Sequence, residues 1–492
     1  MTTESTQQCA PTVTAIAWIG RGVADEKPQT IQIEPSTLKE LLDSGGGVDE
    51  TTDSDAPPEP AEGGRARGSG AKRETTPTAP ADPEDKYNMQ DYDKEAMSGP
   101  TMKGIAVFAN PQDDPYITSQ QEDSEDEREA EAMRITAKDN LAVVGKFDGD
   151  DSTLLVYLYN AESGDFYVHH DYPVAAPILC LEPIGYDPGE DSKKGNLIGV
   201  GTMDSHVDIW DLNIVNAVKP VVRLRGTDPT KRRKKRDGSA QSHSDAVLSL
   251  SWNREADHLL ASGGADQLVV LWDIDAAKVA QNLPLYDGMV QSLEWQPAQS
   301  SVLLAGTRTG KVRLDDGRLD VPVAEWTFEG EELEVEKLFW DRQNEHHAFV
   351  LTSDGKLRYL DTRKAGEVLL EVQAHDKEAS SLALSGVDGL IATAGGEEAR
   401  FWQLNRSSGE LNLVASRQFH LGKVRAAGFC PDVPSVLLVG GEKQDLVHLY
   451  DCARHPACSQ AFSNLKPAAE VQPLAEETGD AAAEAEDVEM GE

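Results

Sequence analysis

A short pattern recurs along this chain at steps of 42 to 62 residues. Each copy is an apolar, alternating stretch that ends in an aromatic residue, an aspartate or a leucine, and the clearest copy is "LVVLWDID" at Trp272. The other six copies close at Tyr159, Trp210, Asp315, Leu360, Trp402 and Tyr450. One β-strand ending in Trp-Asp at a period in the forties is typical of a propeller blade of four strands. The pattern therefore predicts a ring of blades.

A second repeated element sets the number of blades. It is an alternating strand that ends in an aromatic residue, as in "AVLSLSW" to Trp252, "MVQSLEW" to Trp295 and "EVEKLFW" to Trp340. Weaker copies are "APILCLE", "ASSLALS" and "VRAAGFC", and the N-terminal "VTAIAW" fits as well. These seven stretches are candidates for the innermost strands, and they match the seven Trp-type strands in number. The predicted fold class is all-β, a seven-bladed WD-repeat β-propeller.

The first blade is predicted to be split by a disordered acidic insertion. Residues 1–20 supply its inner strand, residues 21–135 are the mostly disordered insertion, residues 136–464 are the propeller, and residues 465–492 are a disordered acidic tail. The net charge is 46 − 86 = −40, and the insertion alone sums to −15. Such segments bury too little apolar surface to offset the entropy of ordering them. Pairing the N-terminal strand with the later strands would close the ring without a free sheet edge.

The chain shows little sign of membrane or catalytic function. Its N-terminus has neither a basic start nor an apolar core, and no apolar run is long enough to cross a bilayer, so we expect no membrane partner. Five cysteines without a regular framework favour a reducing compartment. There is no Gly-rich phosphate loop, nucleophile elbow or helical pair of metal ligands. We therefore expect a non-enzyme with no cofactor, no metal and no small-molecule substrate.

Four polar residues of the clearest repeat have the spacing of a buried, hydrogen-bonded tetrad. They are His243, Ser262, Asp266 and Trp272. Asp266 in a tight turn can accept a hydrogen bond from the histidine, while the serine hydroxyl and the tryptophan N–H hold the histidine, so that each buried polar atom is satisfied. The alternative is a catalytic His–Asp pair. A structural tetrad is favoured because the set degrades in other blades, to Ala305 and Thr309 in the fourth and to Ala392 and Gly396 near the sixth.

The stretch "CARHPAC" has spacing that resembles a zinc site. Its candidate ligands are Cys452, His455 and Cys458, with Cys430 as a fourth. The stretch begins at the end of a Trp-type strand, however, and no second knuckle pairs with it. Because structural zinc sites have four closed ligands, we interpret it as an ordinary strand connection.

A run of six basic residues interrupts the acidic chain. It consists of Lys231, Arg232, Arg233, Lys234, Lys235 and Arg236, and it lies in the connection that lengthens one repeat step to 62 residues. The alternatives are a solvated loop, a contact with RNA phosphates, or a nuclear localisation signal that binds an import receptor. We favour nuclear import, because a compact cationic run in so acidic a chain is unexpected by chance.

Two Trp-type strands are followed by an Asp-x-Arg pattern, at Asp316 with Arg318 and at Asp361 with Arg363. The pattern resembles the box by which WD-repeat substrate receptors dock on the adaptor of cullin-RING ubiquitin ligases. The favoured alternative is an ion pair that braces neighbouring blades. Separately, Ser124 precedes three acidic residues and is a candidate site for an acidophilic kinase, or else part of an ordinary acidic segment.

Nearly the whole chain resembles the periodic tryptophan protein 1 family of eukaryotic WD-repeat proteins. The resemblance is carried by the acidic insertion, the basic loop and the segments "VTAIAWIGRGVA", "DPYIT", "DNLAVVG", "DFYVHHD", "GNLIGVG", "IWDLNIV" and "HSDAVLSLSWN". It implies a nuclear, mainly nucleolar scaffold in large ribosomal subunit assembly and rRNA processing, with pre-ribosomal proteins or rRNA particles as partners. It also implies a link to histone tails. A chromatin-associated histone reader and a ubiquitin-ligase substrate receptor are the alternative functions.

Overall fold

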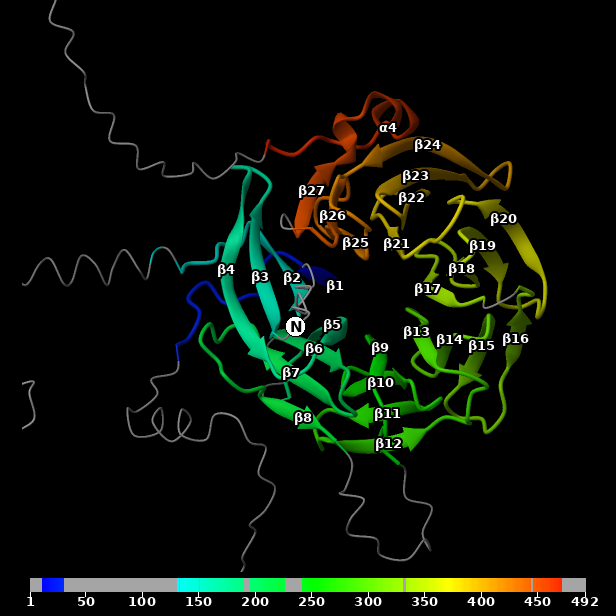
Figure 1. Cartoon of the computed structure of the whole chain (residues 1–492), viewed down its shortest axis with the longest axis horizontal. Coiled ribbons are helices and arrows are strands. Elements are labelled where there is room, and N and C mark those ends of the chain that lie inside the picture. The colour runs from blue at the N-terminus through cyan, green and yellow to red at the C-terminus, as the bar shows by residue number, and fades with distance from the viewer. Residues whose placement is uncertain are drawn as a thin grey trace, which may run out of the picture. The chain divides into compact units, whose positions relative to one another are not determined.

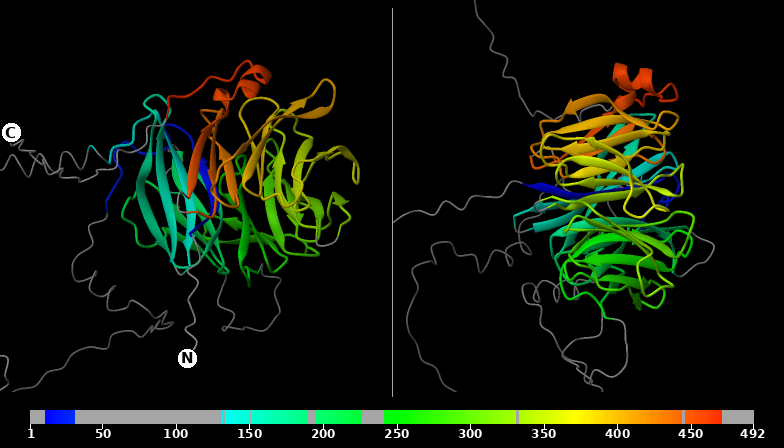
Figure 2. Two further views of the ribbon diagram at one scale, coloured as in Figure 1. Left: turned by 45° about the horizontal axis from the view of Figure 1, so that its top comes forward. Right: turned by 90° about the vertical axis from the view of Figure 1, so that its right-hand side faces the viewer.

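The computed structural model describes residues 11–30, 131, 133–149, 151–188, 194–225, 241–330, 333–443 and 446–470. Within these residues, seven antiparallel sheets are arranged around a ring (Figure 1). Six of the described sheets have four strands and one has three. Seen from its side, the ring has strands that run across its thickness (Figure 2). The predicted seven-bladed β-propeller is therefore confirmed.

The blades follow one another in chain order. Within each blade the first strand lies at the central channel and the last lies at the outside. The first blade has β1 (Thr12–Ile19), β2 (Asp139–Asp148), β3 (Asp151–Asn160) and β4 (Asp165–Val174). The second has β5 (Ile178–Tyr186), β6 (Lys194–Thr202), β7 (Val207–Asp211) and β8 (Val222–Leu224). The third has β9 (Val247–Trp252), β10 (Leu259–Gly264), β11 (Val269–Asp273) and β12 (Lys278–Asn282). The fourth has β13 (Val290–Trp295), β14 (Val302–Thr307), β15 (Lys311–Asp316) and β16 (Ala324–Thr327).

The remaining three blades complete the ring. The fifth has β17 (Val335–Trp340), β18 (His347–Thr352), β19 (Lys356–Asp361) and β20 (Val368–Gln373). The sixth has β21 (Ser381–Leu384), β22 (Leu390–Gly395), β23 (Glu398–Asn405) and β24 (Glu410–Gln418). The seventh has β25 (Ala426–Phe429), β26 (Val436–Gly440) and β27 (Val447–Asp451), followed by the short helices η3 (Cys452–Arg454) and α4 (Pro456–Ala461). Cys458 and Phe462 bury α4 against the outer strands of the sixth and seventh blades.

Burial explains why the clearest Trp-type strand, β11, is apolar at four consecutive positions instead of alternating. Each Trp-type strand is the third strand of its blade, and β11 lies between neighbouring blades. In β11, for example, the first four residues are buried and only Asp273 is partly exposed. Strands covered on both faces lose the apolar–polar alternation that marks a one-sided sheet. The core is accordingly divided into clusters that lie between adjacent blades, such as the one holding Ile198, Val200 and Trp210 against Val156.

The first blade joins the two ends of the ring. Strand β1 pairs with β2, with Trp18 opposite Ala142, and its other side meets the seventh blade, where the N–H of Val13 donates to the carbonyl of Gly441 at 2.9 Å. A Cβ atom on Gly440 would lie 2.4 Å from Cγ1 of Val13, so only glycine permits this approach of the two blades. The N-terminal strand thus lies inside the fold, between blades that are far apart in sequence.

The described ends of the predicted insertion are attached to the propeller. Gln29 forms a parallel bridge with Ile214 of the second blade, and the side chain of Ile135 is buried. The N–H of Ile135 donates to the carbonyl of Glu26, which draws the two ends together. Most of the predicted disordered insertion, and the tail beyond residue 470, lie outside the described residues. In the part of the chain that is described, no helix has the length and apolar character needed to cross a membrane.

Candidate functional site

The structure brings the four tetrad residues together in the third blade. The ring nitrogens of His243 lie 3.0 Å from Oδ1 of Asp266 and 2.7 Å from Oγ of Ser262. The indole N–H of Trp272 donates to the same Ser262 hydroxyl at 2.7 Å. The tryptophan therefore binds the serine and not the histidine, which completes a chain from the turn at Asp266 to the third strand.

The burial of this tetrad gives it no access to a substrate. The His243 side chain has no exposed surface, and both of its ring nitrogens are already hydrogen-bonded. Burial raises the pKa of Asp266, but hydrogen bonds from His243 and from the N–H groups of Ser244 and Leu268 outweigh burial and lower that pKa below its usual value. A carboxylate held in this way anchors a turn. The geometry favours the structural role over a catalytic pair.

The sixth blade keeps more of the tetrad than the sequence predicts. His375 lies 3.0 Å from Oγ1 of Thr393, and the indole N–H of Trp402 donates to the same hydroxyl at 2.9 Å. The predicted serine position, Ala392, is one residue out of register, because Ile391 pairs with Trp402 just as Leu260 pairs with Trp272. Thr393 is therefore the equivalent of Ser262, and its hydroxyl makes the same contacts.

The fourth blade replaces the tetrad with a different buried contact. Ala305 takes the serine position, as expected, and Asp315 stands where the third blade has Trp272. Asp315 accepts hydrogen bonds from the Tyr286 hydroxyl at 2.5 Å and from Nε of Arg313 at 2.8 Å. The Arg313 guanidinium also lies 3.3 Å from the centre of the Tyr286 ring. A charged, stacked pair therefore fills the space of the missing indole, which explains the loss of the Trp-Asp signal.

One face of the ring carries the connections between first and second strands and between third and fourth strands; we call it the AB face. Because successive strands alternate in direction, each inner strand ends at this face and begins at the other. The insertion connects β1 to β2 and the tail follows β27, so Gln29, Ile135 and Ala468 all lie at the AB face. Arg225 and Gln241, which flank the basic run, connect β8 to β9 at the opposite face.

Both Asp-x-Arg patterns lie on the AB face. The guanidinium of Arg318 donates to both oxygens of Asp316, at 2.9 and 2.6 Å, and that of Arg363 donates to both oxygens of Asp361, at 2.9 and 2.8 Å. Each ion pair lies within the turn that follows its own strand. The prediction of an ion pair between neighbouring blades is therefore wrong. The aspartates are buried, whereas the arginine side chains are 74% and 59% exposed.

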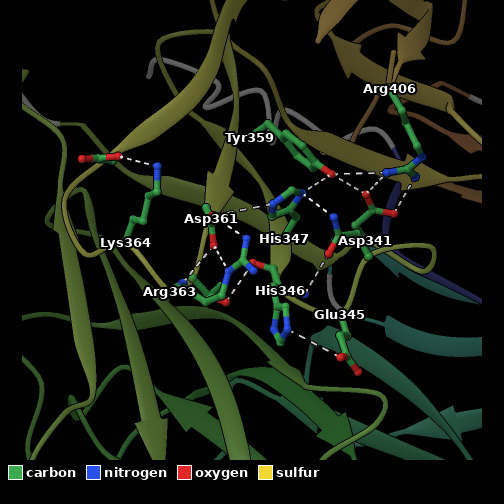
Figure 3. A network of polar contacts seen from close by, with 12 residues as sticks. Asp341, Glu345, His346, His347, Tyr359, Asp361, Arg363, Lys364 and Arg406 are labelled. Atoms are coloured by element: carbon green, nitrogen blue, oxygen red, sulfur yellow. Dashed lines mark hydrogen bonds and ion pairs between the residues drawn. The ribbon is translucent and has the colours of Figure 1, made fainter. Parts of the chain in front are cut away.

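A larger polar network on the same face joins the fifth and sixth blades (Figure 3). Buried Asp341, directly after β17, accepts two hydrogen bonds from the Arg406 guanidinium at 2.6 and 2.8 Å and a third from the Tyr359 hydroxyl at 2.5 Å. His347 lies 2.8 Å from that hydroxyl and 3.9 Å from Asp361, which connects the network to the Asp-x-Arg turn. Burial opposes ionisation of Asp341, but Arg406 and Tyr359 lower its pKa below the usual value.

Only part of this network leaves a signal in the sequence. A turn residue follows the inner-strand tryptophan in three blades, at Asn253, Gln296 and Asp341. The side-chain oxygen of each accepts a hydrogen bond from the main-chain N–H two residues further along, so the sequence can predict a turn at this position. The partner Arg406 comes from the next blade, 65 residues later, and no spacing rule connects the two.

Comparison with known proteins agrees with this architecture. A family model described as a WD domain, G-beta repeat matches residues 235–273, the span that holds the tetrad. The periodic tryptophan protein 1 homolog of Drosophila melanogaster is 32% identical over 460 residues, which covers 92% of this chain and 96% of that protein. The chain belongs to the periodic tryptophan protein 1 family.

Two yeast proteins extend this relationship. An uncharacterised WD repeat-containing protein of Schizosaccharomyces pombe is 30% identical over 92% of this chain and 91% of its own length. Periodic tryptophan protein 1 of Saccharomyces cerevisiae is 25% identical over 92% of this chain and 90% of its own length. The similarity to these family members therefore spans the propeller together with most of the remaining chain.

The three cysteines of the predicted zinc site, all in the described part of the chain, do not converge on one centre. Cys452 and Cys458 are buried around η3 and α4, while Cys430 lies in a separate cluster with Tyr159 and Val436. Across the described ranges, no group of three or more His, Cys, Asp or Glu side chains is arranged to hold a metal ion. Two further predicted sites, Ser124 and the basic run from Lys231 to Arg236, lie outside the described residues.

Proposed function

We propose that the protein is a non-catalytic scaffold in large ribosomal subunit assembly and rRNA processing, located in the nucleus and mainly in the nucleolus. The proposal rests on membership of the periodic tryptophan protein 1 family, which the similarity over 92% of the chain supports. The resemblance to that family implies a role in large-subunit assembly. A rigid ring that presents connecting loops on both faces is suited to holding partners rather than transforming them. Pre-ribosomal proteins or rRNA particles are the proposed partners.

The proposal is tested by sedimentation of nuclear extract with and without RNase. A ribosomal scaffold co-sediments with precursors of the large subunit, and RNase treatment releases it from those fractions. Histones serve as the internal control in the same gradients. Persistence with nucleosomes after RNase, without any signal in the precursor fractions, would support the histone-reader alternative and contradict the scaffold proposal.

Nuclear import through the basic run is part of this proposal. Six cationic residues in a chain of net charge −40 offer a compact site for an import receptor. Replacing all six residues from Lys231 to Arg236 with glutamine should leave the protein in the cytoplasm. A matched control replaces the dispersed exposed residues Lys138, Lys364 and Lys423 with glutamine and should not affect localisation. Nuclear accumulation of the six-residue variant would show that import uses another signal.

A second candidate function is docking on a ubiquitin-ligase adaptor. The observation that favours it is the repetition of the same turn in the fourth and fifth blades, each presenting an exposed arginine held by a buried aspartate. An adaptor contact through these turns requires both guanidinium groups. Substituting Arg318 and Arg363 with alanine together should abolish co-purification with the adaptor but leave sedimentation with ribosomal precursors intact. No co-purification of the unaltered protein with the adaptor would eliminate this candidate.

A further inference from the structure

We propose that Arg254 and Arg342 form a binding site for a carboxylate side chain of a partner peptide, where the central channel opens at the AB face. The inference deepens the proposed scaffold function and rests on it, because it names one contact by which the propeller would hold a protein. It concerns neither the tetrad nor the Asp-x-Arg turns. Three features of the molecule support this site: the positions of the two arginines, the absence of direct polar partners among the described residues, and the charges around them.

The two arginines occupy equivalent positions in alternate blades. Arg254 lies two residues after Trp252 of β9, and Arg342 lies two residues after Trp340 of β17. Both side chains line the central channel, which has a volume of about 330 Å³. The blade between them has Pro297 at the corresponding position, so the pair is separated by a neutral segment. Arg342 also borders two further hollows on the AB face, one toward the fourth blade and one toward the sixth.

Neither guanidinium is held by a direct polar contact in the described part of the chain. Among the described residues, Arg254 and Arg342 take part in no hydrogen bond or ion pair, although Arg318, Arg363 and Arg406 on the same face are all ion-paired. Burial and the positive charge of Arg254 lower the pKa of Arg342, and the charge of Glu294 opposes this only in part. An anion bound between the two guanidinium groups would relieve their repulsion.

Two partly buried carboxyl groups, Glu182 and Glu294, attract the arginines electrostatically, but their hydrogen bonds come from main-chain groups. Glu182 accepts the main-chain N–H of Trp252 at 3.2 Å, and Glu294 accepts that of Trp340 at 2.5 Å. Each carboxyl thus connects its own blade to the next. Burial raises the pKa of Glu182 to about 7 and that of Glu294 well above its ordinary value. At neutral pH these groups carry less negative charge than exposed glutamates, and the mouth of the channel keeps its positive character.

The surroundings favour a peptide over a nucleic acid. Exposed Glu255 and Asp257 follow Arg254, and exposed Glu345 follows Arg342, so the cationic pair is bordered by acidic residues. A phosphate backbone needs an extended row of cations and would be repelled by this border and by a chain of net charge −40. A peptide with one aspartate or glutamate flanked by basic residues matches both the centre and the border. Arginine is well suited to hold such a carboxylate by paired hydrogen bonds.

A peptide array tests the proposal with the full-length protein. The probes are basic peptides of about twelve residues that carry glutamate, glutamine or phosphoserine at the centre, together with a single-stranded RNA oligonucleotide. We expect peptides with glutamate to bind about tenfold more tightly than those with glutamine, as a charge-assisted hydrogen bond allows. This preference should disappear in the double variant Arg254→Gln, Arg342→Gln.

The matched control is the double variant Arg318→Gln, Arg363→Gln, which removes two ion-paired arginines from the same face and should keep the glutamate preference. Melting temperatures of all variants verify that the propeller remains folded. Equal binding of glutamate and glutamine peptides would overturn the proposal, and so would binding confined to RNA or to phosphoserine. Such a failure leaves the scaffold function standing if the unaltered protein still sediments with ribosomal precursors.

Discussion

The indole N–H of Trp18 donates a hydrogen bond to the main-chain carbonyl of Gly428 at 2.9 Å, between the first and the seventh blade. The same bond recurs where neighbouring blades are continuous in sequence. Trp295 donates to the carbonyl of Ser251, and Trp340 donates to that of Glu294, both at 3.1 Å. The ring is therefore closed by the contact that also joins its interior blades, although the closing residues are 410 positions apart.

Removal of the N-terminal strand should abolish this closure. Deleting residues 1–20 exposes the paired edge of β2 and leaves the Val13 pocket beside Gly440 empty, so we expect aggregation or rapid degradation. Deleting residues 45–100 instead should alter the melting temperature little, because loop-closure free energy changes by only about 0.6 kcal/mol for each halving of loop length. Differential scanning fluorimetry of both proteins distinguishes the outcomes. Similar melting of the two would mean that β1 contributes nothing to closure.

The tetrad hydrogen bond can be measured with two equivalent tryptophans. Trp272 and Trp210 are both buried on third strands, but Nε1 of Trp210 has no acceptor among the described residues because Val200 replaces the serine. Trp272→Phe should cost about 1–3 kcal/mol more than Trp210→Phe, since it leaves the Ser262 hydroxyl without its donor. Trp272→Ala should cost about 3–5 kcal/mol. Urea unfolding measures these differences, and equal losses for the two phenylalanine variants would refute the role of the hydrogen bond.

The sequence predicts contacts within a blade better than contacts between blades. The repeat revealed the blades because third strands such as β11 are buried by neighbouring blades and need apolar side chains. It revealed the tetrad of His243 because all four residues lie within 30 positions. It could not reveal contacts between blades, such as Arg406 with Asp341, which depend on how neighbouring turns approach in space. Nor could it locate Arg254 and Arg342, whose shared feature is the channel between them.

The network of the fifth and sixth blades should be sensitive to loss of its guanidinium. Arg406→Ala leaves the carboxylate of Asp341, which is 3% exposed, without its main counter-charge. Removing one partner of a buried ion pair is costly, and we expect a loss of about 3 kcal/mol, the lower end of the usual range because Arg406 is 30% exposed.

Arg318→Ala is the matched control for this loss. It also removes a bidentate arginine from the AB face, but that side chain is 74% exposed, so the melting temperature should hardly change. Chemical denaturation of both variants provides the measurement. If Arg406→Ala proved as stable as Arg318→Ala, the network would not hold the fifth and sixth blades together.

A pair of buried histidines should make stability depend on pH. His169 and His170 lie with their Nδ1 atoms 2.7 Å apart, and Nε2 of His169 lies 3.1 Å from the carbonyl of Met133. Because that carbonyl can only accept, His169 carries its proton on Nε2, and its Nδ1 accepts from His170. A second proton on Nδ1 of His169 then has no acceptor, whereas Nε2 of His170 lies 2.9 Å from the Tyr172 hydroxyl. Burial, reinforced by the neighbouring His169, lowers the pKa of His170 to about 3.

The consequence follows from comparing the folded and unfolded chains. The unfolded chain binds a proton at His170 near the ordinary pKa of 6.5, whereas the folded chain resists it until about 3, so stability is complete above pH 6.5 and is lost as the pH falls. Between pH 7 and pH 5 this group alone should cost about 2 kcal/mol. His170→Gln removes the titration and should flatten the pH dependence of the unfolding free energy by that amount. The control His258→Gln alters an exposed histidine and should keep the slope of the unaltered protein. An unchanged slope in His170→Gln would mean that the histidine pair takes up its proton without disturbing the first blade.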